Sequence, residues 1–232
     1  PTVIALLGRT WQPFGGSGYL ILVALLALTT VLSLALILLP VVVLRRRQRE
    51  RLPGAGRAPP AAYFAALGIG FLLVEVALVQ QFVLVLDHSA RSFAVVVFGL
   101  LAFSGIGSLL SPRLPWRGCL AAVVVALALY PFVLSAALPA LLGRTLPVRV
   151  AATLGLLAPL GVLMGMHFPR GLAVLGSARP SRLPLAWAVN GFTSVVSAIL
   201  AAMIALSWGF GAVFACAAVA YATALATARG GS

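Results

Sequence analysis

The chain has 232 residues, of which 62% are hydrophobic and only 8% are charged, and its mean hydropathy is +1.16. Soluble domains carry about 25% charged residues, so this composition excludes a self-contained soluble enzyme and predicts lipid as the surrounding solvent. All 16 basic residues are arginines, set against three acidic residues, which gives a net charge of +13. Because the arginines cluster between apolar runs, they favour contact with a membrane surface over nucleic-acid binding.

The first 44 residues predict a lead-in followed by one membrane span. Residues 1–17 mix apolar and turn-forming residues, and Trp11 and Phe14 suit the membrane interface. An uninterrupted apolar stretch at 18–44 is long enough to cross the hydrocarbon. The arginine-rich segment 45–60 follows and ends at two prolines, which predicts a loop on the cytoplasmic side.

The rest of the chain predicts six more spans. They lie at about 62–86, 92–111, 119–142, 148–168, 184–207 and 209–227. With loop 45–60 inside, alternation leaves only four of the 16 basic residues outside: Arg9, Arg91, Arg144 and Arg149. This bias predicts an N-terminus outside and a C-terminus in the cytoplasm. The expected fold is therefore an all-α, polytopic transmembrane bundle of about seven helices over 18–227, with a cytoplasmic tail at 228–232.

Glu75 is the residue that most needs an explanation, because it falls near the middle of the predicted span 62–86. A charge at that depth costs a few kcal/mol and normally faces a partner or water. Two interpretations stay open: a proton or cation site, and a carboxyl group that ties helices together. Gly68 lies on nearly the same helical face and would let another helix come close.

Other polar residues extend the list of candidates. Gln80 and Gln81 lie away from the Glu75 face, so we expect them to pair inside the bundle. Asp87 and His88 at the outer loop favour a helix cap, with a surface pair and a ligand site as the alternatives. His167 and Asn190 both fall near the inner ends of their predicted spans, where they can meet.

Several kinds of site are not indicated by the sequence. Cys119 and Cys216 have no metal-binding spacing, and the chain has no phosphate loop, dinucleotide fingerprint, HExxH or nucleophile elbow. We therefore predict no catalytic residues, metal or cofactor in this chain. Small residues recur at helix-packing spacing, as in Gly161 and Gly165, and predict sites of close helix approach.

The sequences of several predicted spans resemble those of a known family of membrane proteins. The segments YFAALGIGFLLVEVALVQQFVLVLDH, SFAVVVFGLLAFSGIGSLLS, GMHFPRGL and LAWAVNGFTSVVSAI occur in that order. Together they resemble the membrane domain of bacterial spermidine-synthase-like integral membrane proteins, in which hydrophobic helices are fused to an aminopropyltransferase-like Rossmann domain. The resemblance covers most of the chain from about residue 18. It implies that these residues occupy recurrent family positions: Glu75, Gln80, Phe168, Pro169, Trp187, Asn190 and Gly191.

The resemblance implies three functions that remain open. The first is a membrane anchor or accessory subunit in a bacterial inner membrane, with lipid and other membrane subunits as partners. The second is a transporter or channel module for a polyamine or other cation, with Glu75 as the binding carboxylate. The third is the membrane half of an aminopropyltransferase-like or methyltransferase-like enzyme whose Rossmann domain is absent from these 232 residues.

Overall fold

A computed structural model describes residues 15–40 and 60–228, and every regular element within those ranges is helical. Most of the predicted lead-in, almost all of loop 45–60 and the tail beyond Ala228 lie outside the described residues. The described elements are α2 (Gly15–Ser33), the π-helical turn η1 (Leu34–Leu38), α4 (Ala61–Leu86), α5 (Ser89–Leu110), η2 (Ser111–Arg113), α6 (Trp116–Leu141), α7 (Leu146–Gly165), α8 (His167–Ala178), η3 (Pro180–Arg182) and α9 (Leu183–Thr227).

Six of the described helical segments are long and apolar enough to cross a membrane. The predicted all-α membrane bundle is thereby confirmed, and the predicted ends of α4, α5, α6 and α7 agree with the structure to within about three residues. In α4 the helix ends coincide with residues that interrupt a helix: it begins after Pro60 and ends at Asp87, whose φ is 59°. At 26 residues α4 is about 39 Å long. That length exceeds the hydrocarbon thickness of about 30 Å.

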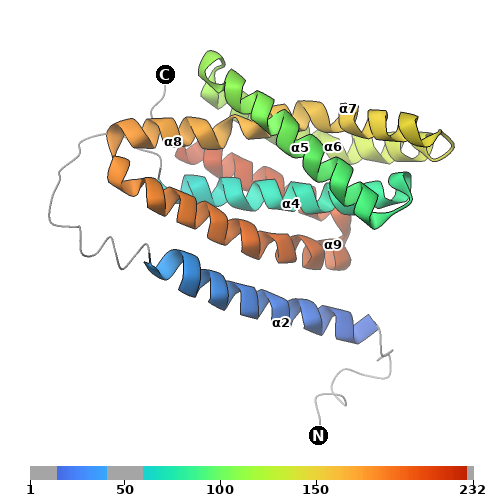
Figure 1. Ribbon diagram of the computed structural model, residues 1–232, viewed down its shortest axis with the longest axis horizontal. Coiled ribbons are helices and arrows are strands. Elements are labelled where there is room, and N and C mark those ends of the chain that lie inside the picture. Colours follow the sequence, from blue (N-terminus) through green and yellow to red (C-terminus); the bar gives the residue numbers. More distant parts are fainter. Residues whose placement is uncertain (1–14, 41–59, 229–232) are drawn as a thin grey trace, which may run out of the picture.

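α9 holds two crossing segments in one 45-residue run. A straight helix of that length would extend about 68 Å. Gly209 interrupts it with φ of 80° and ψ of 173°, which is not helical. Because Asn190 and Tyr221 line the same cavity beside Gly68 of α4, the two halves of α9 run in opposite directions (Figure 1). The division predicted between 207 and 209 is confirmed, and it accounts for the expected count of about seven.

The segment after Phe168 corrects one prediction. We expected residues 169–182 to be a loop, but α8 continues to Ala178 and the short helix η3 follows. His167, Gly171 and Leu175 are buried at four-residue spacing, so one face of α8 packs on the bundle although the segment also carries arginines. Hydropathy alone does not reveal such a helix.

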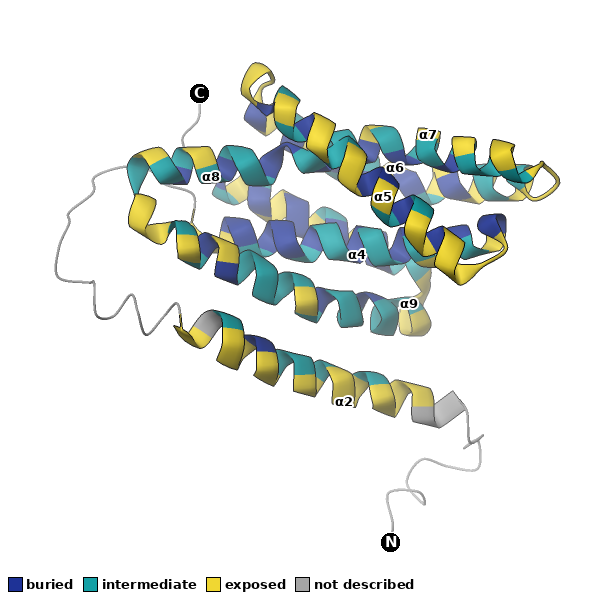
Figure 2. Cartoon of the chain, viewed as in Figure 1, coloured by how far each residue is buried: buried dark blue, intermediate teal, exposed yellow. Residues whose placement is uncertain are grey.

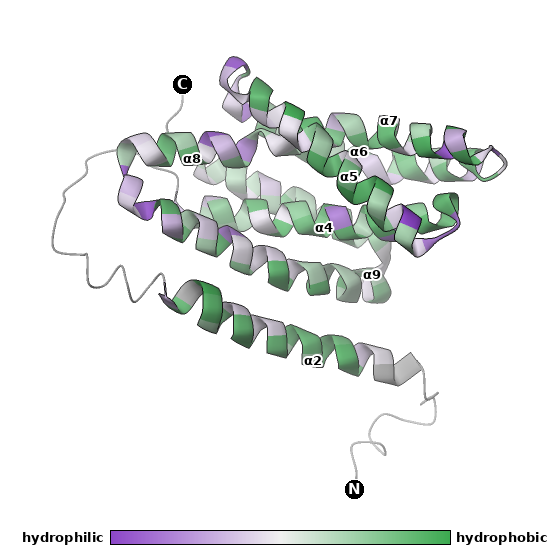
Figure 3. Ribbon diagram, viewed as in Figure 1, coloured by the Kyte–Doolittle hydropathy of each residue, from purple (hydrophilic) through white to green (hydrophobic). Residues whose placement is uncertain are grey.

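The links between helices alternate between two ends of the bundle (Figure 1). The links at 87–88 and 142–145 and the break at Gly209 lie at one end. The links at 111–115 and 179–182 lie at the other, which we call the basic end because its described arginines are Arg113, Arg117, Arg170, Arg179 and Arg182. In Figure 3 the hydrophilic residues gather at the helix ends and the helices between them are mostly hydrophobic.

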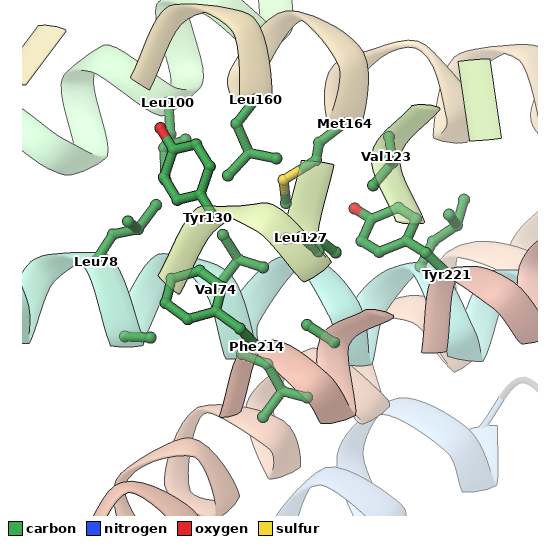
Figure 4. Packing of buried hydrophobic residues seen from close by; sticks show 14 of the residues in the cluster. Val74, Leu78, Leu100, Val123, Leu127, Tyr130, Leu160, Met164, Phe214 and Tyr221 are labelled. Carbon is green, nitrogen blue, oxygen red and sulfur yellow. The ribbon is translucent and has the colours of Figure 1, made fainter. Parts of the chain in front are cut away.

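α4 forms the centre of the bundle. It packs against α9 and α5, and half of its residues are buried, whereas α2 packs against α9 and has a largely exposed apolar surface (Figure 2). Val74 and Leu78 of α4 meet side chains of α6, α7 and α9 in the core (Figure 4). The bundle therefore surrounds α4, the helix that carries Glu75.

α5 and α7 approach each other closely through glycines. A Cβ on Gly107 would overlap the carbonyl of Val162, and a Cβ on Gly165 would overlap the backbone of Ser104. Ser104 Oγ also donates a hydrogen bond of 3.2 Å to the carbonyl of Gly161. The close approach predicted at Gly161 and Gly165 is thus present, since backbones touch only where side chains are small.

Candidate functional site

Glu75 lies half-buried on α4, one turn beyond Phe71 and Leu72. Its carboxylate makes no hydrogen bond or ion pair with any residue that the structure describes. A carboxyl group that tied helices together would show such a partner, so the geometry leaves this group available to a proton or a cation from outside the described chain.

Hydrogen bonds to backbone carbonyls join α4 to the first half of α9. Asn190 Nδ2 donates to the Phe64 carbonyl (3.1 Å), Thr193 Oγ1 to that of Ala65 (3.2 Å) and Ser194 Oγ to that of Gly68 (3.3 Å). A Cβ on Gly68 would come within 2.5 Å of the Asn190 carbonyl oxygen, so the close approach expected there is real. Asn190 therefore acts first as a tie between helices.

A cavity of about 180 Å³ lies beside this contact. Residues from α4, α7, α8 and both halves of α9 line it: Leu67, Gly68, Phe71, Leu72, Met164, Phe168, Asn190, Ser194 and Tyr221. Glu75 follows Phe71 and Leu72 by one turn, so its carboxylate belongs to the same stretch of α4 as the cavity wall. The lining is mainly apolar with a few polar groups, which is the usual make-up of a small-molecule site.

His167 is completely buried at the start of α8. Its carbonyl accepts a 2.8 Å hydrogen bond from Tyr63 Oη, and Trp116 Nε1 donates to the same hydroxyl at 3.1 Å. Its ring lies 6.2 Å from that of Tyr221, and neither ring nitrogen has a hydrogen-bond partner among the described residues. His167 and Asn190 thus lie at the same end and are connected through Tyr221, which lines the cavity with Asn190.

The glutamines correct another expectation. Gln80 is exposed, and Gln81 Nε2 is buried without a hydrogen-bond partner among the described residues, so the expected pairing inside the bundle is absent for this amide group. Gln81 instead lines a pocket of about 320 Å³ with Pro131, Pro139 and Phe214, far along α4 from the cavity beside Gly68. The wall around Gln81 is largely apolar, with Ser135 as its other polar side chain.

The residues of the resemblance are partly brought together. The Phe168 ring lies 5.9 Å from that of Phe64 and 4.7 Å from that of Trp187, and Phe168 lines the cavity with Asn190. Gly191 has open space around it. The sequence did not indicate Tyr63 or Tyr221, because tyrosines in apolar spans look like ordinary packing residues until their distant partners are known.

Asp87 and His88 close the link between α4 and α5. His88 Nδ1 accepts a 3.3 Å hydrogen bond from the Ala90 amide, so His88 caps α5 as expected. Asp87 instead forms a 2.5 Å ion pair with Arg149, which also donates to the Val85 carbonyl at 2.7 Å. Hydrogen bonding from Arg149 holds the pKa of Asp87 below its ordinary value. The pair joins the ends of α4 and α7.

This ion pair gives a pH-dependent prediction. Because the folded-state pKa of Asp87 is depressed, its contribution to stability is present above the unfolded pKa of about 3.9 and is lost as the pH falls through the folded pKa. We expect the melting temperature of the wild type in detergent to fall between pH 6 and pH 3 more steeply than that of Asp87→Asn. Parallel curves for the two proteins would show that the pair contributes no stability.

Among the described residues, no group of three His, Cys, Asp or Glu side chains could hold a metal ion. Glu75 is the only acidic residue on α4. Comparisons of the chain with models of protein families, with curated proteins and with solved structures find no match.

Proposed function

We propose that this multi-pass membrane protein is an anchor or accessory subunit of a larger membrane assembly, of the type formed by the membrane domain of spermidine-synthase-like proteins in a bacterial inner membrane. The observation that carries the proposal is how the bundle uses its polar side chains. Asn190, Thr193, Ser194, Ser92 and Ser104 all donate to backbone carbonyls of neighbouring helices. Such ties make a rigid scaffold and leave few polar groups to line a transport path.

The exposed surface supports the same proposal. α2 and the turn η1 pack against α9 and otherwise present apolar side chains, with Leu36 of η1 72% exposed. A span so little covered by its own chain offers a large surface to a neighbouring subunit or to lipid. The bias of arginines toward the basic end supports the orientation that goes with this proposal, with that end facing the cytoplasm.

Extraction in a mild detergent tests the anchor proposal. The tagged full chain, carrying a photo-crosslinking amino acid at Leu36, is irradiated in membranes, extracted with digitonin and examined by native mass spectrometry. Leu109 on α5, 79% exposed, supplies the matched position on another face. We expect one stoichiometric protein partner, crosslinked from at least one of these positions. A monomer that carries only lipid, with no protein adduct from either position, would contradict the proposal.

The unpartnered carboxylate favours a second candidate, a transport module for organic cations. Glu75 lies one helical turn beyond Phe71 and Leu72, which line the cavity of about 180 Å³, and it has no described partner. If it binds the cation, Glu75→Gln should reduce uptake of labelled spermidine into proteoliposomes by about tenfold or more, since removing one partner of a buried charge pair costs more than about 1.4 kcal/mol. Gln80→Ala, on the exposed face of the same helix, is the control and should leave uptake unchanged. Equal uptake by Glu75→Gln and the wild type, or none by the wild type, would remove this candidate.

A further inference from the structure

The basic end holds a small pocket that neither proposed function uses. Ser111, Leu114, Trp116, Cys119, Met166, His167 and Arg170 line it, where the link between α5 and α6 meets the start of α8. Arg170 connects its walls by donating a 3.0 Å hydrogen bond to the Ser111 carbonyl. The pocket therefore lies between three helices at the level where Figure 3 shows hydrophilic residues.

Two groups in this pocket have unused hydrogen-bonding capacity. A guanidinium group has five N–H donors, and the Arg170 side chain donates only to Ser111 among the described residues. His167 is completely buried with both ring nitrogens unpartnered, and burying such a group costs about 1–3 kcal/mol unless something satisfies it. The interior space is only about 10 Å³, which is room for roughly one water molecule. A larger ligand must therefore sit at the mouth of the pocket.

The positive charge at the mouth of the pocket favours an anionic ligand. Arg113 and Arg117 are exposed and flank the lining residues Leu114 and Trp116 along the chain. No Asp or Glu lies on α6, α8 or the link 111–115. Basic pockets between membrane helices bind the headgroups of anionic lipids, because phosphate oxygens accept several arginine N–H bonds at once.

We propose that this pocket binds the headgroup phosphate of an anionic phospholipid, with Arg170 as the main contact and Arg113 and Arg117 at the rim. The acyl chains then lie against the apolar surface of α5, whose Ile106 and Leu109 are exposed. A bound headgroup therefore connects the link between α5 and α6, at 111–115, to α8, which follows α7 in the chain.

Lipid binding to the purified full chain tests this inference. The protein in neutral detergent is titrated with phosphatidylglycerol or with phosphatidylcholine, and bound lipid is counted by native mass spectrometry. We expect a preference for phosphatidylglycerol that falls about fivefold in Arg170→Gln and in the double variant Arg113→Gln/Arg117→Gln. Arg144→Gln, an exposed arginine at the opposite end, is the matched control and should retain the preference.

The outcomes separate the lipid from other sources of phosphate. Arg170 also donates a hydrogen bond to the Ser111 carbonyl, so its replacement removes a contact within the fold. If Arg170→Gln does not fold, the double variant Arg113→Gln/Arg117→Gln supplies the test instead. Equal binding of the two lipids by the wild type, or an equal loss in Arg144→Gln, would overturn the proposal. Displacement of phosphatidylglycerol by inorganic phosphate at low millimolar concentration would assign the pocket to free phosphate and would also overturn it.

Discussion

Gly165→Leu is expected to lower the melting temperature of the detergent-solubilised protein by about 5–10 °C. A Cβ at Gly165 already overlaps the backbone of Ser104 on α5, and backbone cannot move aside as a flexible side chain can. Overpacking of this kind costs about 1–3 kcal/mol and occasionally more, and 1 kcal/mol shifts the melting temperature of a chain of this size by about 2–4 °C. Gly107→Leu, which overlaps the Val162 carbonyl from the other side, should have a similar effect.

Two glycines on the same helices provide the controls for this prediction. Gly105 of α5 and Gly155 of α7 are exposed, and a Cβ at either would meet nothing within 4 Å. Their leucine variants should melt within about 2 °C of the wild type, because a leucine there enters open space and has a good helix propensity. If all four variants lose the same stability, the contact between α5 and α7 does not depend on these glycines as we infer.

Gly209→Val is expected to destabilise the reversal of α9. At φ of 80° and ψ of 173° the backbone lies in a region that is almost exclusive to glycine, and another residue held there costs about 1–3 kcal/mol. The variant should therefore melt about 3–10 °C lower than the wild type. Circular dichroism at 222 nm during heating provides the measurement.

Gly211→Val is the matched control for the reversal. Gly211 lies two residues away, has open space around it, and does not have a positive φ. Its valine variant should lose no stability through helix propensity, because valine is a slightly better helix former than glycine. Equal destabilisation by the two variants would mean that the cost arises from the β-branched side chain rather than from the backbone at Gly209.

Much of the fold follows from the sequence, because lipid imposes one simple requirement on each span. Apolar length predicted α4 to α7, and the SWGFG segment predicted the reversal at Gly209. α8 escaped prediction because its apolar residues share a helix with arginines, so its burial becomes evident only from packing against Tyr63 and Phe64. Periodicity within a short segment carries too little information to separate such a helix from a loop.

The candidate site was predictable only in part. Glu75 stands out in any apolar span, and the sequence placed His167 and Asn190 at the same end. The expected pairing is absent for the Gln81 Nε2 group, since the side chains that surround it on α6 and α9 are mostly apolar. The roles of Tyr63 and Arg149 depend on partners that are more than 50 residues away along the chain, and a single sequence does not reveal such contacts.

The central claim is that seven apolar segments cross the membrane, with α9 crossing twice. Cysteine labelling tests it most directly. Cys119 and Cys216 are first replaced by alanine, and single cysteines are then placed at Gly143, Ser181 and Ser207 and exposed to a membrane-impermeant maleimide in sealed vesicles of each orientation. We predict that Gly143→Cys and Ser207→Cys label from one face and Ser181→Cys from the other. Labelling of Ser207→Cys together with Ser181→Cys, or of all three from both faces, would contradict the account.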